Sequence, residues 1–101
     1  MVLWDIDAVR LADAENVLGG LGKVSTSIVE LTMAPDIDAA AADAVKAHGK
    51  IDILVNNAGI TGGNAPTWEL SPEVWQRVID VNLVGPFLTS RAVVPQMLKQ
   101  G

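Results

Sequence analysis

Short apolar runs alternate with amphipathic stretches along this chain, and the alternation predicts strands separated by helices. Residues 2–4 and 24–32 are predicted as strands, with Ile28 and Val29 as the apolar part of the second. Residues 53–55 form a continuous apolar run that is too short for a helix, as is typical of a parallel strand covered on both faces. The pattern therefore predicts an α/β fold.

Helical periodicity occupies the intervals between these strands. Asp7 can cap a first helix, because its carboxylate can accept hydrogen bonds from free amides of the first turn. The apolar face of this helix is predicted at Leu11, Ala14, Leu18 and Leu21. A second helix is predicted over 36–48, with Pro35 near its start and Gly49 just after its end. Its apolar or alanine positions are 37, 40, 41, 44, 45 and 48.

The last predicted helix begins at Ser71-Pro72-Glu73. This triplet supplies an N-cap serine, a proline in the first turn and an acid near the positive end of the helix dipole. The helix is predicted to run from Pro72 to about Lys99. Its apolar stripe is formed by Trp75, Val78, Ile79, Val93, Val94 and Met97.

Asn82 falls on this apolar stripe. A buried amide without a partner costs several kcal/mol, so Asn82 requires either a defined partner or a ligand. Pro86 lacks the N–H that would bond to the carbonyl of residue 82, and a free carbonyl beside an amide is a place that can hold water. A simple kink at Pro86 is an interpretation of at least equal weight.

The stretch Ile51–Ile60 is the most informative part of the chain. Its apolar run ends in two amides, Asn56 and Asn57, and then in the small residues Ala58 and Gly59. Small residues allow a ligand to approach the backbone closely, and ligands of open α/β sheets bind at the carboxyl ends of strands. The residues alone favour equally a ligand-binding edge and an Asn-rich turn that satisfies its own backbone.

Asp5 lies at the tip of the first predicted strand. In dinucleotide-binding folds an acid at the end of the second strand accepts hydrogen bonds from the adenosine ribose hydroxyls. The same charge would repel the phosphate that distinguishes NADP from NAD. Without further context, a solvated acid in a turn is the simpler interpretation of Asp5.

Composition excludes several classes of function. The 101 residues carry a formal charge of -5, which disfavours nucleic-acid binding, and they include no cysteine and one histidine, which leaves no disulfide and no histidine-rich metal site. Hydrophobic residues make up 50% of the chain, so it is expected to bury a core. No apolar run is long enough to span a membrane, and no leader is apparent. These features fit a cytoplasmic protein without nucleic-acid or membrane partners.

Two motifs at a consistent spacing resemble those of the short-chain dehydrogenase/reductase family. Asn56-Asn57-Ala58-Gly59 matches the family's NNAG motif, and residues 80–87 are similar to its DVNLxGxF segment. The resemblance covers the whole chain and implies a single partial Rossmann-like domain over 1–101. Such a doubly wound parallel sheet would contain the family's second to fourth strands and lack its first and fifth.

The resemblance implies a role for each matching residue. Asp5, with Ile6 beside it, matches the acid that binds the adenosine ribose and favours NAD over NADP. Glu30 and Leu31 match an Asp-Val pair that contacts adenine, and the glutamate is a departure from that pair. The other matching cofactor-binding positions are Asn57, Ala58, Gly59, Ile60 and Val81. Asn82 matches the catalytic asparagine, which holds a water in the proton relay.

The family's other motifs have no counterpart in this sequence. The glycine-rich TGxxxGxG turn is absent, and the composition contains no tyrosine for a YxxxK motif. We therefore expect an internal portion of an oxidoreductase that interconverts an alcohol and a ketone with NAD, in a homo-oligomer. One alternative is a non-catalytic fragment that folds only by self-association or by complementation with another chain. A weaker one is an adenosine-binding half-site.

Overall fold

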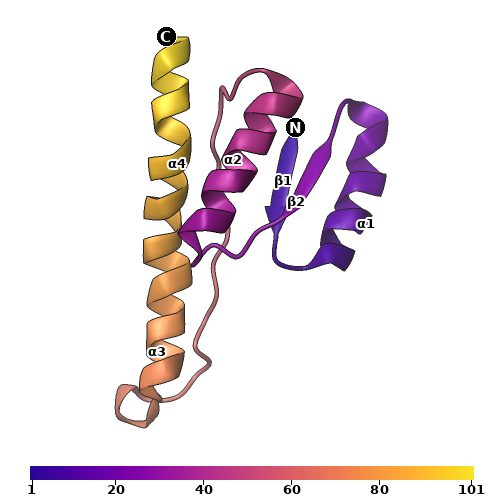
Figure 1. Cartoon of the computed structure of the whole chain (residues 1–101). Coiled ribbons are helices and arrows are strands. Elements are labelled where there is room, and N and C mark those ends of the chain that lie inside the picture. Colours follow the sequence, from indigo (N-terminus) through magenta and orange to yellow (C-terminus); the bar gives the residue numbers. More distant parts are fainter.

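The computed structural model describes all of residues 1–101 and consists of a small parallel sheet with helices around it (Figure 1). β1 and β2 pair in parallel, with Val2 opposite Ser25 and Asp5 opposite Ile28. The elements in chain order are β1 (Val2–Asp5), α1 (Ala8–Leu18), a 3-10 turn (Gly19–Leu21), β2 (Ser25–Ile28), α2 (Ala34–His48), a second 3-10 turn (Thr67–Glu69), α3 (Pro72–Ile79), a π-helical turn (Asp80–Val84) and α4 (Gly85–Gln100).

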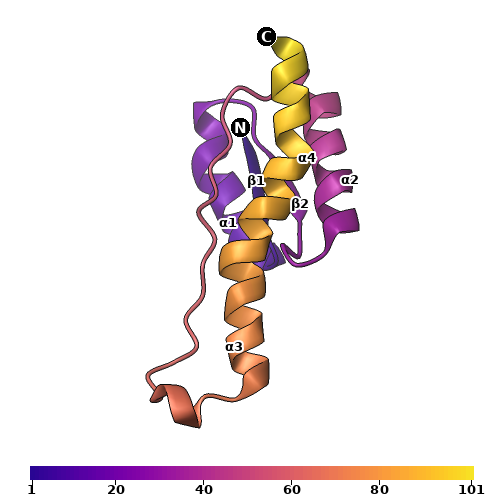
Figure 2. The same cartoon turned by 90° about the vertical axis from the view of Figure 1, so that its left-hand side faces the viewer.

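The helices lie on both sides of the two strands. α1 packs against β1 and β2, α2 packs against β2, and α4 packs against α2. Figure 1 shows α1 on one side of the sheet and α2 with α4 on the other. In both views α3 and α4 form one long rod whose α3 end projects beyond the sheet (Figure 2). No helix of the structure combines the length and the apolar character that crossing a membrane requires.

The predicted helix boundaries at Asp7, Gly49 and Ser71 are confirmed, because they depend on local chemistry, whereas α2 begins at Ala34, two residues before the predicted Asp36. Asp7 caps α1 by accepting hydrogen bonds from the backbone of Val9 and Arg10, and Ser71 caps α3 through Val74. Gly49 follows α2 with φ +82°, a left-handed conformation that favours glycine. On α1 the predicted apolar face is wrong at Leu21, which is 85% exposed.

The core is small and lies where α2 meets β2. Val29, Ile37 and Ala40 form it, and the partly buried side chains packed around them are Trp4, Leu31, Leu88 and Ala92. The buried positions of α2 are Ile37, Ala40, Ala41 and Ala44, as the periodicity predicts. Only 10 of the 101 residues are buried, however, so much of the apolar surface stays exposed.

The predicted strand over residues 53–55 is wrong in this structure. The structure assigns no strand between α2 and the Thr67–Glu69 turn, and Ile53 and Val55 are 80% and 74% exposed. A strand exists only through hydrogen bonds to a neighbour, and the sheet contains β1 and β2 alone. The predicted strand over 24–32 is also shorter, since it pairs with β1 only over Ser25–Ile28 and then turns into α2.

The α3–α4 rod matches the predicted helix over Pro72 to Lys99 and adds one irregularity. Between α3 and α4 the backbone widens into the π-helical turn, where the N–H of Gly85 donates to the carbonyl of Asp80, five residues earlier. Pro86 follows directly and cannot donate to the carbonyl of residue 82. The widened turn therefore lies around Asn82.

Candidate functional site

The carboxyl ends of β1 and β2 form one end of the candidate site. The strands are parallel, so Asp5 and the segment that follows Ile28 leave the sheet together, and the N–H of Val29 donates to the carbonyl of Asp5 at 2.9 Å. Asp5 is half-buried, and its Oδ1 accepts from the backbone N–H of Asp7 at 2.9 Å. Ile6 beside it is 58% exposed. This edge presents a carboxylate whose second oxygen has no partner within the chain.

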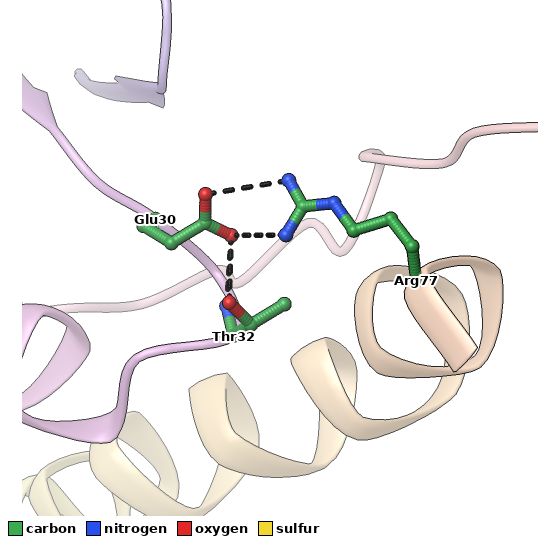
Figure 3. A network of polar contacts seen from close by, with 3 residues as sticks. All are labelled: Glu30, Thr32 and Arg77. Carbon is green, nitrogen blue, oxygen red and sulfur yellow. Dashed lines mark hydrogen bonds and ion pairs between the residues drawn. The ribbon is translucent and has the colours of Figure 1, made fainter. Parts of the chain in front are cut away.

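Glu30 has its carboxylate occupied by protein groups (Figure 3). Arg77 on α3 donates to both carboxylate oxygens, at 3.0 and 3.3 Å, and the backbone and hydroxyl of Thr32 donate to Oε1. Hydrogen bonding from Arg77, followed by that from Thr32, holds the pKa of Glu30 below its ordinary value although partial burial opposes the shift. Glu30 therefore ties the exit of β2 to α3.

Arg77 is a residue that the sequence analysis missed. The spacing of Glu30 and Arg77, on separate elements 47 positions apart, gives no indication that they pair. The guanidinium fork matches a carboxylate in two parallel hydrogen bonds, which makes the contact geometrically specific. The nearest available signal is the position of Arg77 on the same predicted helix as Asn82.

Leu31 at the exit of β2 lies against Gly85, which directly follows the π-helical turn. Leu31 is half-buried, and a Cβ added at Gly85 would lie 3.4 Å from both the Cβ and the carbonyl oxygen of Leu31. The loop and the rod are therefore direct neighbours at position 85. Val81, predicted to lie on the adenosine side, is only 6% exposed and packs in the interior.

Asn82 has the defined partner that its sequence position requires. Its Oδ1 accepts from the backbone N–H of Ile60 and its Nδ2 donates to the carbonyl of Ile60, both at 2.8 Å. The side chain is nevertheless exposed, so the prediction of a buried amide is wrong. Pro86 has no N–H, so the carbonyl of residue 82 lacks its α-helical donor at the same turn as the Asn82 amide.

The segment Asn56–Gly59 is fully on the surface. All four residues are exposed, and neither Asn56 nor Asn57 makes a side-chain hydrogen bond, in contrast to an Asn-rich turn that satisfies its own backbone. A Cβ added at Gly59 would lie 3.7 Å from Oδ1 of Asn82, so the glycine and the π-helical turn are direct neighbours. The structure brings Gly59, Ile60 and Asn82 together.

A hollow of about 350 Å³ lies where this segment meets α3. It is lined by Ile60, Thr61, Glu73, Val74, Arg77 and Val78. Its polar groups belong to Thr61, Glu73 and Arg77, and the guanidinium of Arg77 is already paired with Glu30. No group of three or more His, Asp or Glu side chains is placed to hold a metal ion.

The sequence of the whole chain matches one protein family. A family model described as short chain dehydrogenase covers residues 1–101. The chain belongs to the short-chain dehydrogenase/reductase family. A relative named 2-dehydro-3-deoxy-L-rhamnonate dehydrogenase (NAD(+)), from Sphingomonas sp., is 41% identical over the full 101 residues. The human dehydrogenase/reductase SDR family member 4 is 38% identical over 78 residues, or 77% of the chain.

Solved structures of the family contain the same arrangement of elements. An NAD+-bound xylitol dehydrogenase superimposes on 98% of the chain with a TM-score of 0.93 and 30% identity. A metagenomic short-chain oxidoreductase in complex with NADP superimposes with a TM-score of 0.90 and 33% identity. The chain is therefore an α/β segment that matches part of the family's Rossmann fold.

The family members are considerably longer than this chain. It spans 39% of the Sphingomonas dehydrogenase and 28% of the human protein. It spans 38% of the xylitol dehydrogenase and 45% of the metagenomic enzyme. The Sphingomonas and xylitol dehydrogenases are described with NAD and the metagenomic enzyme with NADP. The chain shares with them its two β-strands and the flanking helices.

Proposed function

We propose that this chain forms one wall of the active site of an NAD-dependent oxidoreductase that interconverts an alcohol and a carbonyl compound. The observation that carries the proposal is the double hydrogen bond between Asn82 and Ile60, both at 2.8 Å. It fixes the π-helical turn beside the Asn56–Gly59 segment, and both match family motifs. The Sphingomonas relative is named as an NAD(+) dehydrogenase, which agrees with this choice of reaction.

In this proposal Asp5 and the exposed Asn57–Ile60 segment hold the cofactor. Asp5 fits the hydroxyls of a ribose, because its carboxylate keeps one oxygen without a partner and accepts only one hydrogen bond within the chain. The exposed backbone of Ala58 and Gly59 fits a ligand that lies against the chain. When bound, the nicotinamide ring would supply hydride transfer.

Asn82 acts in the proposal through a water molecule. Its amide is fixed by Ile60, and the carbonyl of the same residue lacks its α-helical donor because Pro86 has no N–H. A free carbonyl accepts a hydrogen bond from water, and a water held there can pass a proton to or from a neighbouring acid or base. The positioned carbonyl is thus the chemical contribution of the π-helical turn.

The kinetics of the protein that contains this chain test the proposal. With panels of alcohols and ketones, we expect NAD-dependent turnover, followed by the absorbance of the reduced cofactor. Asn82→Ala should lower kcat by about 100-fold, the scale of general acid–base catalysis. Asn82→Asp, which keeps the acceptor for the N–H of Ile60, tests whether the loss follows from misfolding. Turnover unchanged by Asn82→Ala would overturn the assignment.

Asp5 is the residue expected to select NAD. Asp5→Ser should raise activity with NADP relative to NAD by about tenfold or more. The substitution removes the repulsion between the Asp5 carboxylate and the phosphate that distinguishes NADP, and a repulsion of about 1.4 kcal/mol corresponds to that factor. Asp13→Asn is the matched control, since Asp13 is exposed on α1 and makes no hydrogen bond or ion pair. A protein that prefers NADP before substitution would contradict the assignment of Asp5.

A second candidate function is that of a fragment completed by self-association or by another chain. The exposed Ile53 and Val55, together with a sheet of two strands, favour it. An open sheet edge and unpartnered apolar side chains promote pairing with further strands. Light scattering on the 101-residue chain tests this second candidate. Association is expected if the chain is completed by self-association, and a folded monomer at high concentration would contradict that route.

A further inference from the structure

The carboxylate of Glu30 is almost saturated by donors from within the chain (Figure 3). Its Oε1 accepts from Nη1 of Arg77 at 3.0 Å, and from the hydroxyl and the N–H of Thr32 at 2.9 and 3.3 Å. Its Oε2 accepts from Nη2 of Arg77 at 3.3 Å. An ionised carboxylate offers about four acceptor positions, and four donors already contact this one.

Arg77 also compensates the charge of this carboxylate. Its guanidinium contacts both oxygens in two parallel hydrogen bonds, which fix the plane of the carboxylate as well as its position. Only 23% of the Glu30 side chain is exposed. A further neutral donor would therefore gain little from Glu30, because the charge that strengthens such a bond is already paired.

Neighbours on its own helical rod favour this orientation of Arg77. Hydrogen bonding to Glu30 raises the pKa of Arg77, and the negative charge of Asp80 on the following turn adds to the shift. Gln76 donates to Oδ1 of Asp80 at 2.8 Å and so fixes that carboxylate in turn. These contacts join the loop after β2 to the rod and involve no residue of the 51–60 segment.

The length of the side chain at position 30 matters for this pairing. The resemblance to the family implies an aspartate that contacts adenine, whereas Glu30 is longer by one methylene. Its bonds to Arg77 are 3.0 and 3.3 Å long, so a side chain shorter by one methylene would leave the guanidinium beyond hydrogen-bonding distance in this arrangement. The glutamate thus has the reach to pair with α3.

We propose that Arg77 is a specificity-determining residue that withholds the Glu30 carboxylate from the base of the dinucleotide. A free carboxylate at position 30 would accept a hydrogen bond from the 6-amino group of adenine. With Glu30 held by Arg77, this amino group gains no such bond from the side chain. The proposal rests on the proposed function, because that function supplies the dinucleotide.

Two dinucleotides that differ only in the 6-amino group test the proposal. They are NAD and its analogue with unsubstituted purine in place of adenine, and the measured quantity is the ratio of their Kd values for the protein that contains this chain. In Arg77→Gln we expect this ratio to shift in favour of NAD by about tenfold or more, the factor for a hydrogen bond to a charged group. Purely structural damage would raise both Kd values alike. A ratio unchanged by Arg77→Gln would overturn the proposal.

Two further variants frame this result. Arg91→Gln is the matched control and should leave the ratio unchanged, because Arg91 is exposed and makes no ion pair. Glu30→Gln removes the charge of Glu30 and keeps an acceptor oxygen for Arg77. We expect its ratio to stay within about 2-fold of the wild type, less than one net hydrogen bond. A loss of tenfold or more in the preference for NAD would overturn the proposal.

A measurement on the wild type covers the case in which Arg77→Gln unfolds. Hydrogen bonding from Arg77 holds the pKa of Glu30 below its ordinary value, so a carboxylate that stays on Arg77 should titrate alike with and without saturating NAD. NMR titration of the Glu30 side-chain carboxyl measures this. A pKa that rises to its ordinary value when NAD binds would overturn the proposal, whereas wild-type protein that binds neither dinucleotide would refute the proposed function.

Discussion

Glu30 and Arg77 show how single residues hold the candidate site together. The two-point contact joins the exit of β2 to the helix that leads into Asn82. The side chains are 23% and 47% exposed, so solvent screens the pair and its contribution to stability is about 1 kcal/mol or less. Its main effect is geometric, because it restrains the loop that carries Leu31.

The same pair makes stability depend on pH. The Arg77 hydrogen bond lowers the pKa of Glu30 from its ordinary value of 4.5, so the unfolded chain binds the proton more tightly than the folded one. The contribution of the pair is present above pH 4.5 and is lost as the pH falls through the lower folded value.

Arg77→Gln should reduce the decrease in stability that acid pH causes. Urea unfolding at neutral pH and at about pH 3 is expected to show a smaller acid-induced decrease in the free energy of unfolding for the variant than for the wild type. Arg91→Gln, at an exposed arginine of α4 without an ion pair, should behave as the wild type. Equal pH dependence of the Arg77 variant and the wild type would contradict the contribution of the pair.

Elements were predictable to different degrees, for physical reasons. Helix starts at Asp7 and Ser71 follow from local capping. The buried alanine face of α2 follows from the helical periodicity of the sequence alone. The run over 53–55 has the composition of a strand, but strand formation depends on a neighbour that periodicity cannot supply. The π-helical turn was predicted only in part. Pro86 indicates that the carbonyl of residue 82 lacks its α-helical donor, but it does not indicate that the turn widens.

Pro86→Ala tests the π-helical turn as an element. The new N–H can bond to the carbonyl of residue 82 and allow regular α-helix, so we expect greater stability of the rod. A regular helix would rotate Asn82 relative to α4, and the N–H of Ile60 should then exchange faster as its acceptor moves away. Pro95→Ala is the control, because this proline lies in the interior of α4 and far from Asn82 along the helix. An unchanged exchange rate at Ile60 in Pro86→Ala would contradict the link between the turn and the segment.

At the scale of the whole molecule, the most evident property is the small core. Only 10 of 101 residues are buried, and apolar side chains such as Ile53 and Val55 face outwards. In the order of a doubly wound sheet, the first strand lies between the second and the fourth. In this chain the sheet consists of β1 and β2 alone, and residues 51–60 pair with neither strand.

Val55→Lys tests whether the exposed segment drives association. A charge at this position should shift the chain towards the monomer in light scattering, because charges on an open edge oppose strand pairing. Leu21→Lys replaces an exposed leucine in the 3-10 turn after α1 and should leave the association state unchanged. A monomeric wild type, or an equal effect of the two variants, would exclude the edge as the cause.

In the proposed function, the exits of β1 and of the 51–60 segment face a nucleotide cofactor. Titration of the protein that contains this chain with NAD, followed by amide chemical shifts, tests it directly. We expect saturable shifts at Asp5, Ile6 and the Asn57–Ile60 segment, with little change on the outer face of α1 around Asp13. Saturable shifts confined to other elements, or no saturable shift at any concentration of NAD, would contradict the account.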